Sequence, residues 1–256
     1  MEERSKRSLG QNFLVDQNVA LKIVDSLQPE PGETVLEIGP GNGALTGLLL
    51  ERARGVLALE KDRRLARKLK AHWPEIGVIG GDALHFDWRR LQGRVERVVG
   101  NLPYNVASPI MWELARHGSG LRRLVFTVQK EVAQRVASPP GSRDYGGLSV
   151  WMQSFVRVRH GFDVSRNVFQ PRPGVTSAVL ILEPLPVSER PADPDSLSRL
   201  IKLCFQNRRK QLGRILKKRW IGALDDWLRD QGLERRNRPE DLSPHQFQAL
   251  SRILSI

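Results

Sequence analysis

The sequence predicts an α/β protein built on a mainly parallel sheet with helices on both faces. Three observations lead to this fold class. Short apolar runs rich in Val, Ile and Leu alternate with stretches in which apolar residues recur at helical spacing. Gly, Pro, Asn and Asp separate the runs, as expected of strand–helix connections. The length of 256 residues and the 40% hydrophobic content suit one large domain with a smaller one.

The alternation begins after a basic N-terminal segment. Asp16 is expected to cap a helix over residues 17–27, whose Val19, Ile23, Val24 and Leu27 share one face. The elements expected next are, in order, a strand over 34–38, a helix over 45–52, a strand over 55–59, a helix over 62–72, strands over 78–79 and 95–99, a helix over 109–116, a strand over 121–128 and a helix over 130–137.

The pattern changes after the turn-forming residues 138–142. A helix is expected over 148–155, followed by two strands over 156–164 and 176–182 with no long helix between them. Such a pair is expected to be antiparallel and to lie at the sheet edge. A proline-rich linker near residue 185 then predicts a domain boundary, giving domains 1–185 and 186–256. The helices expected in the second domain cover 195–205, 211–218, 221–231 and 243–254.

The amino-acid composition favours some classes of partner and site and excludes others. Lys and Arg outnumber Asp and Glu by 41 to 28, which favours a polyanionic partner, most often nucleic acid. Residues 186–256 hold 15 of the basic and 9 of the acidic side chains, so this part is the more basic per residue. One cysteine and five scattered histidines indicate no disulfide and no metal site. Without a signal peptide or a long apolar run, we expect no membrane association and a cytoplasmic protein.

Three consecutive strand ends carry groups that suit an adenosine-containing cofactor. The run Glu37–Gly43 lies between a strand and a helix, where Gly39 and Gly41 allow close approach of a ligand. Glu60 ends the next strand, where a carboxylate can accept hydrogen bonds from ribose hydroxyls. Asp82 follows the third strand and offers an acceptor for an adenine amino group. Glu60 as a helix-capping acid and Asp82 as a loop residue are the simpler alternatives, but the three together favour a cofactor.

The cofactor is then a nicotinamide dinucleotide or S-adenosylmethionine. Gly39, Gly41 and Ala44 satisfy a relaxed dinucleotide fingerprint, so the glycines alone do not decide. Hydride transfer usually needs a placed proton donor or acceptor. The fourth strand instead ends at Asn101-Leu102-Pro103-Tyr104, which offers no strong base. This favours methyl transfer, in which orientation supplies most of the rate.

The stretch 101–104 suits an adenine whose N6 amine is methylated. Asn101 Oδ1 and the Leu102 carbonyl can accept the two amino protons, Pro103 stiffens the turn, and the Tyr104 ring offers a stacking surface. An adenine inside a helix must first be unstacked. Phe169 is the candidate for a second stacking ring, and a loop anchor packed on the core is its alternative role.

Six ordered motifs resemble the adenine N6-dimethyltransferases of ribosomal RNA, and the resemblance covers nearly the whole chain. They are Gln11-Asn12-Phe13-Leu14, Glu37-Ile38-Gly39-Pro40-Gly41-Asn42-Gly43, Gly81-Asp82-Ala83, Asn101-Leu102-Pro103-Tyr104, Gln129-Lys130-Glu131-Val132-Ala133 and Tyr145-Gly146-Gly147-Leu148-Ser149-Val150. The resemblance implies a Rossmann-like S-adenosylmethionine-dependent methyltransferase fold with a seven-stranded sheet and a small helical C-terminal domain. It also implies the cofactor residues Asn12, Leu14, Gly39, Glu60, Asp82 and Asn101.

Two branches of this family differ in substrate. The motifs Phe205–Leu212 and Arg238–Ser243 are similar to the branch that dimethylates two adjacent adenosines in the 3′-terminal hairpin of small-subunit (16S) rRNA. That branch implies action during 30S biogenesis, an immature 30S particle as partner and a monomeric protein. The alternatives are the large-subunit branch, which confers macrolide resistance, and an assembly checkpoint that acts by binding alone.

Residues 196–224 contain nine basic and no acidic side chains, which suits a grip on RNA phosphates, although a solvated helix face is the simpler interpretation. The RNA-binding candidates are Arg208, Arg209, Lys210, Arg214, Lys217 and Lys218. The chain departs from the family in the loop that faces the substrate. Arg166 stands where the family usually has a proline, and Gly174 where it has a lysine. Both departures weaken the assignment of Phe169.

Overall fold

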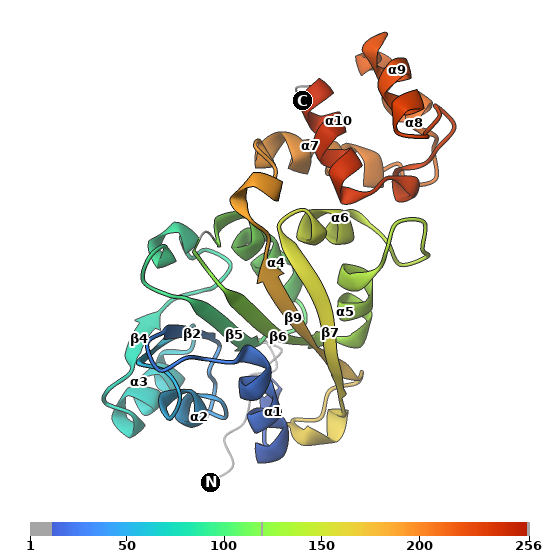
Figure 1. Ribbon diagram of the computed structural model, residues 1–256. Helices are drawn as coiled ribbons and strands as arrows, with labels where there is room; N and C mark the ends of the chain where they lie inside the picture. The colour runs from blue at the N-terminus through green and yellow to red at the C-terminus, as the bar shows by residue number, and fades with distance from the viewer. Residues whose placement is uncertain (1–11, 119, 255–256) are drawn as a thin grey trace. The chain divides into compact units, whose positions relative to one another are not determined.

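The computed structural model describes residues 12–118 and 120–254, and confirms an α/β fold with a seven-stranded, mostly parallel sheet (Figure 1). Gln11 of the first motif lies outside the described residues. The sheet strands are β2 (Thr34–Ile38), β3 (Gly55–Glu60), β4 (Gly77–Gly80), β5 (Arg97–Asn101), β6 (Arg123–Gln129), β7 (Val156–Val164) and β9 (Ser177–Pro184). A separate two-stranded sheet pairs β1 (Phe13–Leu14) with β8 (Phe169–Gln170).

The strand order is β4-β3-β2-β5-β6-β9-β7. The pairs within β4-β3-β2-β5-β6 are parallel, β9 is antiparallel to β6, and β7 follows β9 at the edge, as expected. The chain runs outward from β2 through β3 to β4 and then returns to β5 on the other side of β2. Ligands bind at such a reversal, beyond the carboxyl ends of the strands. Ile38 pairs with Gly100, so the glycine-rich loop and Asn101 begin side by side.

The helices are close to those predicted. They are α1 (Gln17–Leu27), α2 (Thr46–Leu50), α3 (Arg63–His72), α4 (Ala107–His117), α5 (Lys130–Ala137), α6 (Gly147–Gln153), α7 (Pro194–Phe205), α8 (Leu212–Ile215), α9 (Ala223–Asp230) and α10 (Pro244–Leu254). Asp16 caps α1 by accepting a hydrogen bond from Val19 N at 3.0 Å, as predicted. Asp62 caps α3 in the same way through Arg64 N at 2.8 Å.

One hydrophobic core cluster lies between α1 and the sheet. Ile23, Val24 and Leu27 of α1 are buried against strand residues such as Val99 and Val125. Among the strands of the large sheet, α1 contacts β5, β6 and β9, while α3 contacts β3 and β4. This packing holds the carboxyl ends of β2, β3 and β5 in fixed register, which is what a ligand site at that edge requires.

Three local features differ from the sequence-based expectation. The short strands β1 and β8 were not expected, because two residues are too few to show a strand period. Helix α4 begins at Ala107 rather than Pro109, since proline is tolerated in the first turn of a helix. In the C-terminal part, α8 covers only Leu212–Ile215 and a 3-10 turn follows at Lys217–Arg219.

The chain separates into two compact units. Unit 1 contains residues 1–133 and 157–184, and unit 2 contains 134–156 and 185–256. In this division the chain passes from one unit to the other after residues 133, 156 and 184, and the two domains expected from the sequence, 1–185 and 186–256, stay a prediction. Inside unit 2, the Tyr145 hydroxyl donates to Leu242 O at 2.8 Å and Gly141 N donates to Glu240 O at 2.7 Å. These hydrogen bonds attach the 134–156 segment to the C-terminal helices. The local sequence contains no signal that predicts them.

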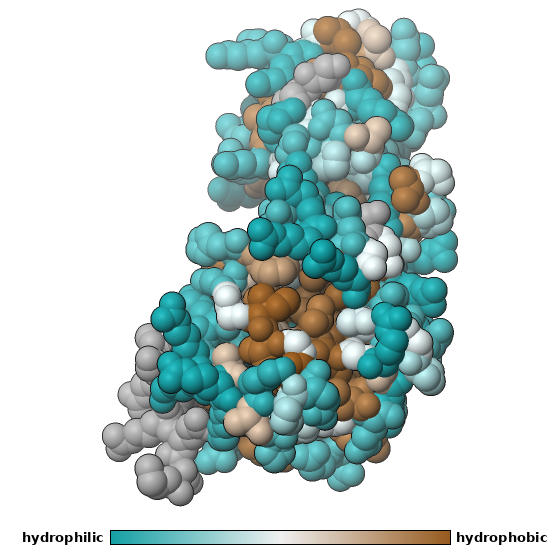
Figure 2. Space-filling view, turned by 90° about the vertical axis from the view of Figure 1, so that its left-hand side faces the viewer, coloured by the Kyte–Doolittle hydropathy of each residue, from teal (hydrophilic) through white to brown (hydrophobic). Residues whose placement is uncertain are grey.

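No helix in the described part of the chain is long and apolar enough to span a membrane. The face in Figure 2 is mainly hydrophilic; hydrophobic side chains are densest near the middle of the view, and a few others appear at its top and right.

Candidate functional site

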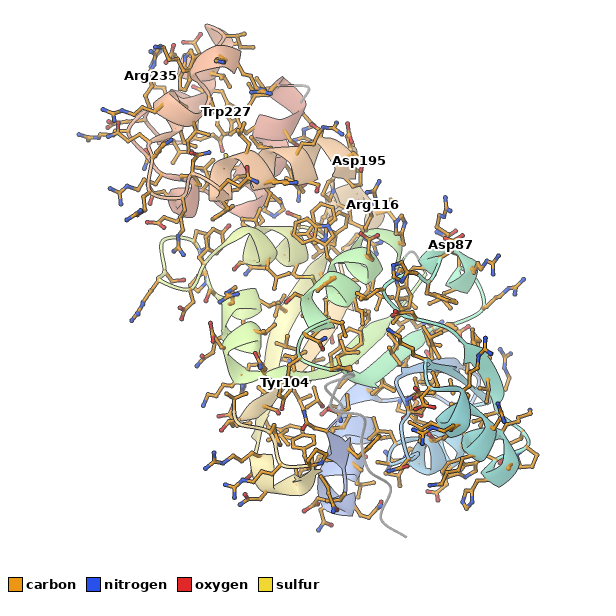
Figure 3. The ribbon with its side chains drawn as sticks, turned by 180° about the vertical axis from the view of Figure 1, so that it is seen from behind. Asp87, Tyr104, Arg116, Asp195, Trp227 and Arg235 are labelled. Carbon is orange, nitrogen blue, oxygen red and sulfur yellow. The ribbon has the colours of Figure 1, made fainter. Side chains whose placement is uncertain are left out.

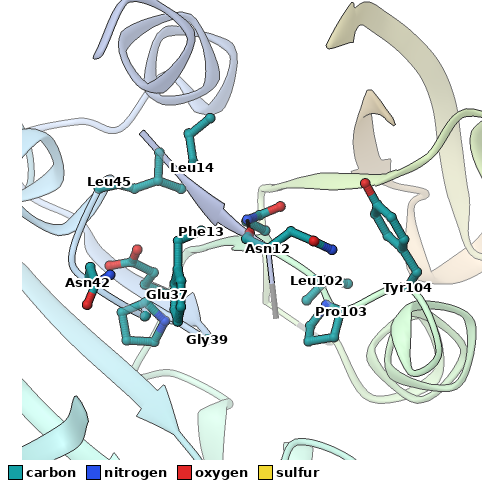
Figure 4. A pocket seen from close by; sticks show the side chains of 14 residues that line it. Asn12, Phe13, Leu14, Glu37, Gly39, Asn42, Leu45, Leu102, Pro103 and Tyr104 are labelled. Atoms are coloured by element: carbon teal, nitrogen blue, oxygen red, sulfur yellow. Dashed lines mark hydrogen bonds between the residues drawn. The ribbon is translucent and has the colours of Figure 1, made fainter. Parts of the chain in front are cut away.

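Two adjoining pockets occupy the carboxyl ends of the strands in unit 1. The first lies between β1 and the turn after β5, and its labelled residues are seen in Figure 4. It is lined by Asn12, Phe13, Leu14, Glu37, Gly39, Pro40, Gly41, Asn42, Ala44, Leu45, Asn101, Leu102, Pro103 and Tyr104. The second shares Gly39 and Pro103 with it and is lined also by Ile38, Leu59, Glu60, Lys61, Gly81, Asp82, Ala83, Leu84, Asn105, Val106 and Ile110.

The glycine-rich loop joins the two pockets. Gly39, Gly41 and Gly43 have φ of 64°, 60° and 83°, a region that other residues adopt only with strain. A Cβ on Gly41 would also lie 2.9 Å from the Phe13 ring, so β1 approaches the loop closely. Glu60 fixes the loop from the other side by accepting Gly41 N–H at 3.2 Å. The loop is therefore shaped by its own glycines and by the carboxylate predicted to meet the ribose.

Glu60 and Glu37 are buried carboxyl groups at this edge. Glu60 is 3% exposed, and burial raises its pKa despite hydrogen bonds from the N–H groups of Asp62 and Gly41. Glu37 is 2% exposed and accepts a hydrogen bond from Thr46 Oγ1 at 2.6 Å. Burial, with the neighbouring Glu60 charge, raises the pKa of Glu37 to about 7. Among the described residues no cationic side chain pairs with Glu37.

Glu37 was not predicted as a site residue. The sequence does contain a signal, because an acid interrupts the otherwise apolar strand β2 just before its carboxyl end. A buried carboxyl with a raised pKa that lines a pocket is typical of a functional group.

Asp82 lies in the second pocket, as predicted from its strand-end position. Its Oδ1 accepts Leu84 N–H at 3.0 Å, and its Oδ2 lies 2.7 Å from Lys61 Nζ. The hydrogen bond from Lys61 holds the pKa of Asp82 below its usual range. Asp82 is thus an anion at neutral pH. The apolar residues Ile38, Leu59, Val106 and Ile110 line the same pocket and suit a flat heterocycle.

The orientation of Asn101 is set by the N-terminal segment. Its Nδ2 donates to the Asn12 carbonyl at 2.8 Å, so Oδ1 is left as the acceptor. Leu102 is 1% exposed and its N–H donates to Thr127 O at 3.1 Å, which fixes the backbone after the strand. The Pro103 carbonyl accepts from Val106 and Ala107 and starts α4.

Tyr104 forms the outer end of the first pocket (Figure 4). Its hydroxyl and Ser177 Oγ share a hydrogen bond of 2.6 Å, which anchors the ring at the start of β9. Burial raises the pKa of this hydroxyl in spite of that bond, so Tyr104 is neutral at physiological pH. The predicted residues of the 101–104 stretch therefore come together around one pocket.

Phe169 does not line either pocket. Its ring is 4% exposed and packs in the hydrophobic core of unit 1, and its backbone pairs with Leu14. This position matches the alternative role considered from the sequence, in which Phe169 anchors its loop by packing on the core. A stacking role would require the ring to leave the core.

The RNA-binding candidates lie in unit 2 and fall into two groups. Arg208 pairs with Glu240 at 2.5 Å and also donates to the Arg143 carbonyl at 2.7 Å, so it holds the unit together. The other five are exposed and form no ion pair with any described residue; they are Arg209, Lys210, Arg214, Lys217 and Lys218.

A cluster beside these cations stabilises the same part of unit 2. Arg235 lies 4.6 Å from the centre of the Trp220 ring and its Nε donates to Asp225 at 2.6 Å. Arg235 and Trp227 are labelled in Figure 3.

In the described residues no group of three or more His, Cys, Asp or Glu side chains could hold a metal ion.

Known proteins resemble the whole chain. Residues 2–255 match the family model described as ribosomal RNA adenine dimethylase. A relative named ribosomal RNA small subunit methyltransferase A, from Maridesulfovibrio salexigens, is 53% identical over 249 residues, which are 96% of this chain and 94% of the relative. A relative of the same name from Oleidesulfovibrio alaskensis is 49% identical over 98% of this chain and 91% of its own length.

Solved structures share the fold. A dimethyladenosine transferase from Plasmodium falciparum has a TM-score of 0.79 at 24% identity, covering 95% of this chain and 96% of its own. The 23S rRNA methyltransferase ErmE has a TM-score of 0.71 at 26% identity, covering 96% of this chain and all of its own. The fold that contains the two pockets is therefore shared with both of these transferases.

Proposed function

The chain belongs to the ribosomal RNA adenine dimethylase family, and from this membership we infer the roles of its residues. It is an S-adenosylmethionine-dependent adenine dimethyltransferase that acts on small-subunit rRNA. We propose that its targets are two adjacent adenosines in the 3′-terminal hairpin, methylated on immature 30S particles. The single observation that carries the assignment is the Asn101 amide, held at a strand end beside the glycine-rich loop with its Oδ1 free to accept.

The residues of the two pockets fit S-adenosylmethionine. Glu37 is a buried carboxylate with no cationic partner in the described chain, and the cofactor carries an ammonium and a sulfonium. Leu14 of β1 and Asn12, which immediately precedes β1, line the same pocket. Glu60 suits the ribose hydroxyls, and Asp82 suits the adenine amino group above the apolar floor of the second pocket. When bound, the cofactor supplies a methyl group activated by the sulfonium.

The target adenine is proposed to enter at the Tyr104 end of the first pocket. Its N6 lone pair is delocalised into the ring, which makes the amine a poor nucleophile. Hydrogen bonds from the two amino protons to Asn101 Oδ1 and Leu102 O favour the pyramidal geometry in which the lone pair can attack. Stacking on Tyr104 stabilises the flipped base by about 1–3 kcal/mol. Asn101 and Tyr104 therefore orient the amine. The methylated N6 would carry a positive charge until it loses its extra proton to solvent, so no side chain has to act as a strong base.

The exposed cations of unit 2 are proposed to bind rRNA phosphates. Arg209, Lys210, Arg214, Lys217 and Lys218 are unpaired within the described chain, so RNA would not have to compete with internal carboxylates. Arg208 is proposed to act indirectly, through its bond to Glu240.

Methyl transfer to isolated ribosomal particles tests the proposal. The protein is incubated with methyl-labelled S-adenosylmethionine and, separately, with immature 30S and with 50S particles. We expect label in N6-dimethyladenosine of the small-subunit RNA only. Label in the large subunit would favour the activity named for the ErmE neighbour. No label on either particle, from folded protein that binds the cofactor, would favour a factor that acts by binding.

A further inference from the structure

We infer that α3, the helix Arg63–His72, is a second RNA-binding surface. It lies on unit 1, beside the glycine-rich loop. The inference rests on the proposed function, because it assigns part of the substrate RNA to a surface outside the two pockets and outside unit 2. The partner is the phosphate backbone of the rRNA substrate.

The composition of α3 is unusual for a surface helix. Five of its ten residues are Arg or Lys and none is acidic. Leu65 and Leu69 are buried against the sheet, and the cations point away from it: Arg63, Arg64, Arg67, Lys68 and Lys70 are all exposed. A helix of ten residues is about 15 Å long, so these charges extend over several successive phosphates rather than one small anion.

The charge pattern opposes the stability of the helix. Arg63 and Arg67, and likewise Arg64 and Lys68, are like charges four residues apart, which destabilise a helix by a few tenths of a kcal/mol per pair. Arg63 and Arg64 also lie at the N-terminal end, where the helix dipole disfavours cations. A polyanion bound along the helix would remove this repulsion.

Only some of these cations have partners inside the protein. Arg64 pairs with the capping residue Asp62 at 2.9 Å. Lys70 Nζ donates to the carbonyls of Pro74 and Ile76 at 2.7 and 2.8 Å. Arg63 and Arg67 are exposed and form no ion pair or hydrogen bond through their guanidinium groups with the described residues. These two arginines are therefore available for a ligand.

A hollow joins α3 to the glycine-rich loop. It is lined by Gly41, Asn42, Lys68, Leu69, His72 and Trp73, and none of these is acidic. The Trp73 ring is fixed against the loop, since a Cβ on Gly43 would lie 2.3 Å from it. His72 meets this ring edge-on, with the two ring centres 4.4 Å apart. Gly41 and Asn42 also line the first pocket. RNA bound in the hollow would therefore be separated from the cofactor by the glycine-rich loop.

A pair of double variants of the full-length protein tests the inference. R63Q/R67Q removes the two unpartnered arginines of α3. K22Q/R94Q is the matched control, because it removes two positive charges from exposed side chains elsewhere in unit 1 that form no ion pair with the residues the structure describes. Binding to immature 30S particles is measured between 50 and 200 mM salt, with S-adenosylhomocysteine present to prevent turnover. The thermal midpoint and the affinity for S-adenosylhomocysteine are measured for each protein.

We expect R63Q/R67Q to bind the particles about tenfold more weakly at the lower salt, with a salt slope reduced by about two. The control should stay within about twofold of wild type. Both variants should keep wild-type affinity for S-adenosylhomocysteine, and R63Q/R67Q should melt no lower than wild type because it loses like-charge repulsion.

Particle binding by R63Q/R67Q that equals the control, or an equal loss in both variants, would overturn the inference. Wild-type protein from the same preparation is assayed for methyl transfer to the particles. If it transfers methyl groups while the α3 variant binds normally, the α3 surface alone is wrong. If wild type transfers none, the proposed function fails whatever α3 does.

Discussion

Two buried glutamates lie near the two ends of strand β2 and have opposite surroundings: Glu33 just precedes the strand, and Glu37 is its second-last residue. Glu33, at the amino end, is 4% exposed and accepts a hydrogen bond from Arg97, itself 6% exposed. Burial pushes the pKa of Glu33 up, but the bonds from Arg97 and from Glu30 N–H, with the charges of Arg97 and Arg122, bring it below its ordinary value. Glu37, at the carboxyl end, has only the Thr46 hydroxyl, and its pKa rises to about 7.

The difference indicates that the amino end of β2 is arranged for stability and the carboxyl end for binding a ligand. A buried carboxylate is stabilising only when a cation and hydrogen bonds compensate for its lost hydration. The amino end supplies them from Arg97, Arg122 and the backbone. The carboxyl end leaves Glu37 without a cation from the described protein, which is the arrangement expected if a cationic cofactor provides one.

The largest effect is expected at the carboxyl end, from Asn101→Ala. The substitution removes the Oδ1 that is proposed to orient the target amine, so methyl transfer should fall by about a thousandfold or more. Cofactor affinity should fall much less, because Glu37, Glu60 and Asp82 remain. Single-turnover transfer to immature 30S particles and a cofactor titration measure the two quantities. Asn18→Ala, which removes an exposed amide on α1, is the control. Turnover by Asn101→Ala at the wild-type rate would remove Asn101 from the mechanism.

The next effect concerns the amino end, where Arg97→Met leaves Glu33 buried without its main partner. We expect a loss of about 3–5 kcal/mol in the free energy of unfolding, measured in urea at pH 7. Arg122→Met is the matched control. Arg122 also pairs with Glu33, at 3.2 Å, but its side chain is 61% exposed, so the loss should stay within about 1 kcal/mol. Equal losses in the two variants would show that burial does not distinguish these ion pairs.

The sequence predicted the sheet and its ligand edge because both depend on local signals. Strand β2 was expected at residues 34–38 and lies there. As expected, Gly39 follows β2, Glu60 ends β3 and Asp82 follows β4. Strand ends, glycines and acids are visible in a single chain because parallel strands bring their carboxyl ends to one edge.

Features that depend on distant contacts could not be predicted. The burial of Phe169 follows from its pairing with Leu14, more than 150 residues earlier in the chain. The bond from Arg208 to Glu240 is likewise invisible in a basic run. The isolation of Glu37 follows from tertiary packing, since the sequence shows an acid but not the lack of a cation around it.

The substitution Glu37→Gln tests the comparison at the carboxyl end of β2, where the cofactor is proposed to bind. A pKa of about 7 in the folded protein, against 4.5 for an ordinary glutamate, means that folding favours the protonated form. The associated stability is present below pH 4.5 and is lost as the pH rises through about 7; the total is about 3 kcal/mol. Glutamine mimics the protonated carboxyl and can still accept from Thr46. The cofactor-free variant should therefore be more stable than wild type above pH 7 and equal to it near pH 4.

Urea unfolding of wild type and Glu37→Gln at pH 8, with and without S-adenosylmethionine, tests most directly whether the carboxyl end gives up stability to hold the cofactor. Without the cofactor we expect the variant to be more stable by about 3 kcal/mol. At one cofactor concentration well above the wild-type Kd, the stabilisation should be smaller for the variant by about 1.4 kcal/mol or more, which is at least a tenfold loss of affinity. A variant that is less stable than wild type, or that gains as much from the cofactor, would contradict this role for Glu37.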